Sequence, residues 1–128
     1  GIICHEIWHA TEIEIISRDY AAFLPGTWDE LNPQGFSYCE DATQIDSIYK
    51  WTLYSSNIED VYFVDNYSCV NEREDRARIM EYFMTHEDEA MMLIQSPVIR
   101  QKLQWMCNGI RNNFDTTGWE DVRWEKLL

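Results

Sequence analysis

Two histidines and a glutamate near the start of the chain are spaced so that they could hold a metal ion. His5, Glu6 and His9 form the pattern H-E-x-x-H and use two of the three histidines in 128 residues. On a helix, positions i and i+4 share one face, so both imidazoles can reach one zinc ion. Glu6 points partly round the same helix, where it can reach a water on the metal. The pattern predicts hydrolysis at a zinc site, in which Glu6 takes a proton from that water and returns it to the leaving amine.

The residues around this pattern favour a buried helix over residues 2 to 18. Apolar side chains occur almost all round the expected helix, and isoleucine recurs most often, as Ile2, Ile3, Ile7, Ile13, Ile15 and Ile16. A solvated helix would not carry two histidines and a glutamate inside such a run. The alternative is a buried helix whose histidines are satisfied by hydrogen bonds alone.

A catalytic zinc needs three protein ligands and one open position, so a third ligand must be found. His86 is the remaining histidine, but it stands among acidic residues at an apparent helix start, which is more typical of a solvated position. Glu12 shares the face of His5 and His9, yet it lies two turns along the same rod and diverges from a tetrahedral site. Glu12 is better placed to accept the outer N–H of a ligating histidine or to hold a nearby loop, and a polar group at the cleft rim is the equal alternative.

Glu74 is the distant candidate for the third ligand. It lies on a second amphipathic helix, beside the expected buried stripe of Ala77, Met80, Phe83 and Met84. Packed against the first helix, Glu74 could project towards the histidine pair. Asn71-x-x-Glu74 is also the spacing of a capping box, so the alternative role of Glu74 is to tie down the helix start.

These motifs resemble those of a known family. His5-Glu6-x-x-His9, followed by Glu74-Asp75-Arg76-Ala77 with Phe83 closing that helix, resembles the zincin metallopeptidases whose third ligand is a glutamate. Within the zincins, the chain looks like the lethal-factor-like and lipoprotein-type zinc-binding peptidases of Gram-positive bacteria. In that group a glutamate opening an E-x-x-A helix completes the zinc site, and a tyrosine seven residues before it stabilises the oxyanion. The resemblance therefore implies Zn²⁺ held by His5, His9 and Glu74, with Glu6 as the base and Tyr67 as the oxyanion donor.

The resemblance covers residues 2 to 85, and the segment from Trp28 to Tyr38 is also similar to the lipoprotein-type members. Arg76 and Arg78 depart from the family, because they occupy a helix that is usually more apolar. Tyr67 makes physical sense without the family, since a phenol O–H donated to a developing oxyanion acts as an oxyanion hole does. The alternative for Tyr67 is an ordinary aromatic residue packed in a loop.

We expect one zincin-like catalytic domain over residues 1 to 128, mainly α, forming the helical part of an α+β metallopeptidase fold. The usual strands would precede Gly1, so we expect an N-terminally truncated part of a longer protein, with any signal or lipid-anchor segment lost. Such a protein would be extracytoplasmic or lipid-anchored. The sequence also predicts an aromatic-anchored loop at 28–38, an ambiguous segment at 42–54 and a short strand at 61–64. Further helices are expected at 71–84, at 85–95 with Thr85 as its cap, from Ser96 to about 110, and at 118–128.

Composition narrows the partners of the protein. The formal net charge of −13 disfavours nucleic acid and anionic lipid, whose phosphates would be repelled, and leaves a peptide or protein substrate.

Four widely separated cysteines form no C-x-x-C motif, so packing is their expected role. Glu6-x-x-His9 has no second E-x-x-H to build a di-iron site. Two functions stay open: a zinc metallopeptidase, which the intact Glu6 favours, and a non-catalytic zincin-like peptide-binding or interaction module.

Overall fold

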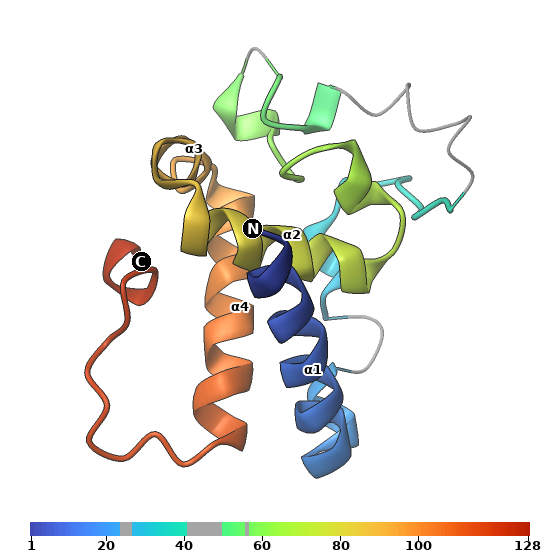
Figure 1. Cartoon of the computed structure of the whole chain (residues 1–128). Helices are drawn as coiled ribbons and strands as arrows, with labels where there is room; N and C mark the ends of the chain where they lie inside the picture. The colour runs from blue at the N-terminus through green and yellow to red at the C-terminus, as the bar shows by residue number, and fades with distance from the viewer. Residues whose placement is uncertain (24–26, 41–49, 56) are drawn as a thin grey trace.

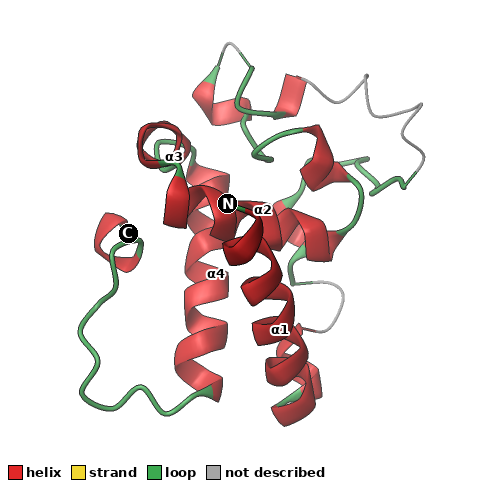
Figure 2. Cartoon of the chain, in the orientation of Figure 1, coloured by secondary structure: helices red, strands yellow, loops and turns green. Residues whose placement is uncertain are grey.

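A computed structural model describes residues 1–23, 27–40, 50–55 and 57–128 of the chain. Within these ranges the protein is mainly helical, as the sequence predicts, and no strand is formed (Figure 2). Four α-helices are described there: α1 (Ile2–Arg18), α2 (Glu72–Thr85), α3 (Glu87–Leu93) and α4 (Pro97–Asn113). None of these four has the length and hydropathy needed to span a membrane.

The α1 helix packs against α2 and α4 through one face. His5, Trp8, Glu12 and Ile15 recur at helical spacing and are its buried residues. Figure 1 shows α1 and α4 side by side, with α2 crossing near the N-terminal end of α1. The predicted bounds of α1 are confirmed, but its burial all round is wrong. Ile2, Ile3, Ile7 and Ile13 are 77%, 76%, 58% and 59% exposed, because the neighbouring helices cover only one side of α1.

The α2 helix begins at a side-chain cap. The Asn71 side-chain oxygen accepts a hydrogen bond from the backbone N–H of Glu74 at 2.9 Å, as the sequence predicts. Acidic residues in the first turn suit the positive end of the helix dipole. Ala77 and Phe83 are buried as expected, whereas Met84 is 45% exposed. Met84 instead lines a small hollow of about 110 Å³ that is bordered by residues of α1, α4 and the C-terminal segment.

Two buried ion pairs fix the first turns of α2 against its neighbours. Lys102 Nζ of α4 lies 2.8 Å from Asp75 Oδ2, and both side chains are fully buried. The Tyr38 hydroxyl donates to the same carboxylate oxygen. Burial lowers the pKa of Lys102 and raises the pKa of Asp75, and each charge offsets that effect on the other. Arg76 pairs with Glu12 of α1, so α2 is tied to α4 and α1 at two consecutive residues.

Residues 61–64 do not form the predicted strand. Val61, Phe63 and Val64 are buried, which explains the strand-like sequence. The backbone N–H groups of Tyr62 and Phe63 both donate to the carbonyl of Trp51, so the hydrogen bonds do not alternate as a ladder requires. The aromatic-anchored loop is confirmed, because the buried Trp28 indole donates to the Tyr38 hydroxyl at 2.8 Å. Of the ambiguous segment at 42–54, residues 42–49 lie outside the described ranges.

The C-terminal half differs from the prediction mainly at helix ends. Ser96 caps α4 through the N–H of Ile99 as expected, although α4 continues to Asn113. His86, and not Thr85, precedes the first residue of α3. The helix predicted at 118–128 is wrong, since only a single 3-10 turn forms at Glu125–Leu127.

Candidate metal centre

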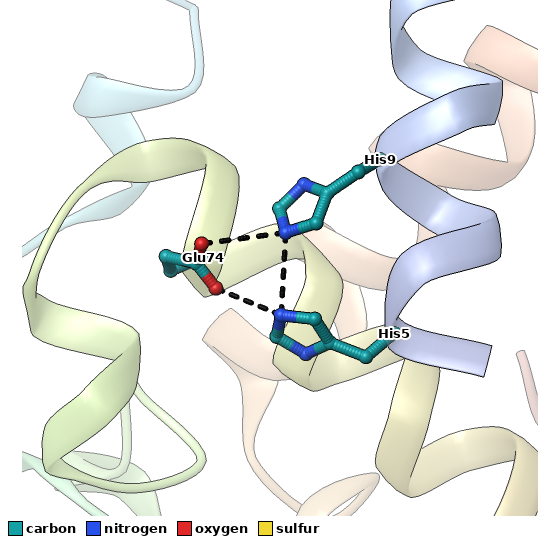
Figure 3. A group of neighbouring side chains, drawn as sticks. All are labelled: His5, His9 and Glu74. Atoms are coloured by element: carbon teal, nitrogen blue, oxygen red, sulfur yellow. Dashed lines mark hydrogen bonds and ion pairs between the residues drawn. The ribbon is translucent and has the colours of Figure 1, made fainter. Parts of the chain in front are cut away.

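Three donor atoms from two helices converge beside the N-terminal half of α1. His5 and His9 stand one turn apart on α1, and Glu74 lies in the first turn of α2 (Figure 3). His5 Nε2 is 2.8 Å from Glu74 Oε2, and His9 Nε2 is 3.3 Å from Glu74 Oε1. The two Nε2 atoms are 3.2 Å apart. The structure thus brings together the three residues that the sequence singles out as ligands.

The spacing of these atoms fits a single small cation. One ligand atom from each residue can be chosen so that all three lie within 4.8 Å of one another. Two ligands at about 2.0–2.1 Å from a tetrahedral zinc are about 3.3 Å apart, close to the His5–His9 and His9–Glu74 separations. Two imidazoles and one carboxylate are also a donor set that zinc takes in catalytic sites. The residues present therefore fit the metal that the resemblance implies.

The backbone and the side chain of Glu74 have separate partners at the helix start. Its backbone N–H is held by Asn71, so Glu74 takes part in the cap. Its carboxylate, however, faces His5 and His9. The helix start therefore aims the carboxylate towards the histidines, because the cap fixes the backbone of the residue that carries it.

The outer nitrogen of His5 faces a glutamate that the sequence analysis does not single out. Glu81 Oε2 lies 3.5 Å from His5 Nδ1, and Glu81 is 6% exposed. Such a carboxylate fixes the tautomer and orientation of a ligating histidine. A signal was present, since Glu81 follows Glu74 by seven residues and so shares its helical face. His9 Nδ1 is buried without a hydrogen-bond partner in the described part of the chain.

Glu12 has partners other than the histidines. From its place in the sequence, Glu12 is expected to accept the outer N–H of a histidine, to hold a nearby loop or to be a polar group at the cleft rim. In the structure it is 2% exposed, accepts a hydrogen bond from Trp8 Nε1 at 3.0 Å and pairs with Arg76. Glu12 therefore holds α2 against α1. The carboxylate near the outer nitrogen of a histidine belongs to Glu81 instead.

Tyr67 lies beside the cluster on the 3-10 turn Asn66–Cys69. Its ring centroid is 6.2 Å from that of His5, and the side chain is 46% exposed. Arg78 sits 5.1 Å from the Tyr67 ring centroid and pairs with Asp65, which caps this turn, and with Glu81. Burial and the Glu74 carboxylate raise the pKa of the Tyr67 phenol above its usual value.

Glu6 is exposed and lines two open hollows that flank the donor atoms. One, of about 300 Å³, is bordered by Ile2, His5, Tyr67 and Glu81. The other, also about 300 Å³, is bordered by His9, Asn71, Arg73 and Glu74. Glu6 is thus the acid that both hollows share, and it makes no hydrogen bond or ion pair within the described residues. A carboxylate in this position is free to exchange a proton with a molecule in either hollow.

The third histidine and the cysteines are not members of this cluster. His86 stacks on Tyr82 at a centroid separation of 4.3 Å and contacts the Thr85 hydroxyl. None of the four cysteines, all of which lie in the described ranges, forms a disulfide, and Cys69 and Cys107 are buried. Comparison with protein-family models, curated proteins and solved structures found no match.

Proposed function

We propose that this protein is a zinc-dependent metallopeptidase whose metal is held by His5, His9 and Glu74. The observation that carries the proposal is the convergence of two imidazoles and one carboxylate from two helices, with His5–His9 and His9–Glu74 separations that suit one tetrahedral zinc. Such a donor set leaves a fourth position for water or substrate. The resemblance to zincins supports the same assignment.

Zinc supplies a lowered pKa for a bound water and a positive charge that polarises the scissile carbonyl. Glu6, exposed beside the cluster, takes the proton of the attacking water and returns it to the leaving amine. The Tyr67 hydroxyl donates a hydrogen bond to the oxyanion that develops on the carbonyl. Glu81, backed by Arg78, holds His5 with its Nε2 turned towards Glu74.

The first experiment measures zinc content and peptide hydrolysis on the same preparations. Protein purified at neutral pH without chelator should carry about one zinc per chain. Glu6→Gln should keep that zinc and lower the hydrolysis of a peptide library by at least about a hundredfold, because the proton acceptor is gone. Glu14→Gln removes an exposed carboxylate from the same helix, where it pairs with Arg18, and serves as the control.

The outcomes separate the two functions left open by the sequence. Absence of zinc would reject the metal assignment and leave a hydrogen-bonded cluster. Undiminished hydrolysis by Glu6→Gln would reject Glu6 as the base. A zinc-loaded wild-type protein that binds peptides without cleaving them would support the non-catalytic module.

The role of Tyr67 has its own test. Tyr67→Phe should lower kcat by about a hundredfold to a thousandfold with zinc content unchanged, because one oxyanion donor is lost. Tyr20→Phe changes an exposed tyrosine on another part of the surface and should have no effect. Equal rates for the two variants would place Tyr67 among ordinary packing residues.

A further inference from the structure

A second, larger hollow lies between α1, α4 and the C-terminal segment. Its volume is about 550 Å³, within the range of pockets that bind small organic molecules. Three aromatic side chains line it: Phe114, Trp119 and Trp124. It contains none of the candidate metal ligands or Glu6, so the proposed hydrolysis does not use it.

The outer wall of this hollow is pinned in place by one arginine. Arg111 Nε and Nη2 donate to the two carboxylate oxygens of Glu125 at 3.0 and 2.7 Å. The same Nη2 donates to the Glu120 carbonyl, and the Val122 backbone N–H donates to Glu125 Oε1. A bidentate arginine pair is among the stronger charged contacts in proteins. These contacts hold the segment 120–125 in place as one wall of the hollow.

The charged side chains around the hollow are already engaged with partners, which disfavours a charged occupant. Arg111 is already paired with Glu125, and Arg18 is paired with Glu14 and lies over the Phe114 ring. An anion would find no unpaired arginine and would meet Asp115 and a chain of formal net charge −13. A cation would meet two guanidinium groups, while Glu125 is already paired with Arg111 and Asp115 accepts a hydrogen bond from the Thr117 backbone N–H. The walls themselves are mostly apolar and leave an uncharged molecule as the occupant that fits.

We propose that this hollow binds an uncharged, ring-containing apolar molecule through stacking and burial against its three aromatic side chains. Exposed Trp119, at 62%, gains cover when such a ligand binds. The binding is non-covalent, since burial raises the pKa of the Cys107 thiol at the hollow to about 12. It is independent of zinc, because no candidate ligand lines the hollow.

The test uses two dyes that differ by one charge. N-phenyl-1-naphthylamine is uncharged, whereas 8-anilino-1-naphthalenesulfonate carries the same ring system with one sulfonate. Fluorescence titration of the full chain should show one site for the uncharged dye, with the sulfonate at least about tenfold weaker. Chelation of zinc should leave both affinities unchanged. Equal affinities, or binding of the uncharged dye that disappears with the metal, would overturn the proposal.

Matched variants locate the dye. Val122→Asp places a charge in the wall of the hollow formed by residues 120–125 and should weaken binding of the uncharged dye about tenfold or more. Met91→Asp places the same charge on exposed α3, away from the hollow, and should change nothing. Trp119→Ser should also weaken binding of the uncharged dye. Because Trp119 is exposed and outside the core, this variant keeps the test valid should Val122→Asp disturb folding. Equal affinities in Met91→Asp and both hollow variants would show that the dye binds elsewhere.

Discussion

Replacing Glu81 with glutamine tests the contact between the Glu81 carboxylate and His5 Nδ1. The change keeps the size of a side chain that is 6% exposed and removes only its charge. Arg78 retains Asp65 as a partner at 2.8 Å, so the fold should survive. Loss of a carboxylate that orients a ligating histidine usually lowers metal affinity about 10-fold to 100-fold.

The geometry places the expected effect at the lower end of that range. Glu81 Oε2 is 3.5 Å from His5 Nδ1, longer than a well-formed hydrogen bond. We therefore expect the zinc Kd to rise about tenfold, which corresponds to about 1.4 kcal/mol of binding free energy.

Competition titration against a chromophoric zinc chelator at neutral pH measures this Kd. Glu6→Gln is the matched control, because it neutralises another glutamate of the same hollow that contacts neither ligating histidine. Its Kd should equal that of the wild type. A Glu81→Gln Kd within about twofold of the wild-type value would refute the role of Glu81 in holding His5. Circular dichroism of both variants checks that their helices are intact.

Three further variants and one zinc titration test the metal ligands and the ion pairs that hold α2 in place. Glu74→Ala should weaken zinc binding far more than Glu12→Ala, and the reverse order would move the third ligand to α1. Glu12→Ala should instead lower the free energy of unfolding by about 3 kcal/mol, because it removes a buried partner of Arg76. Lys102→Met leaves Asp75 buried without its cation and should cost about 3–5 kcal/mol in urea denaturation, whereas an unchanged midpoint would contradict the pair. Zinc at about a thousandfold its Kd should stabilise the wild type by about 4 kcal/mol, and no stabilisation would exclude tight binding to the native state.

The parts of the fold that could be predicted from sequence are those set by neighbours along the chain. The i and i+4 spacing of His5 and His9 and the cap of Asn71 on Glu74 involve residues within one helical turn of each other. Ser96 before Pro97 is likewise a local signal for a helix start. Such signals depend on backbone geometry alone, so they hold whatever packs against them.

The parts that failed depend on contacts between distant segments. Burial of Val61 and Val64 gives a strand-like pattern, but no neighbouring segment in the described ranges supplies a regular ladder. Ile7 is exposed because α2 and α4 cover only one side of α1. The sequence of α1 alone does not encode which side its neighbours cover. Glu81 was missed because its role depends on how α2 crosses α1.

The isoleucines exposed along α1 have a consequence for how the protein behaves in bulk solution. Ile2, Ile3 and Ile7 present branched apolar side chains next to the candidate metal centre. At neutral pH the formal net charge of −13 makes separate molecules repel one another, which keeps these side chains from meeting. That repulsion vanishes near pH 4.4, where positive and negative charges balance. We therefore expect colloidal stability to fall on mild acidification, with light scattering rising before the helices melt.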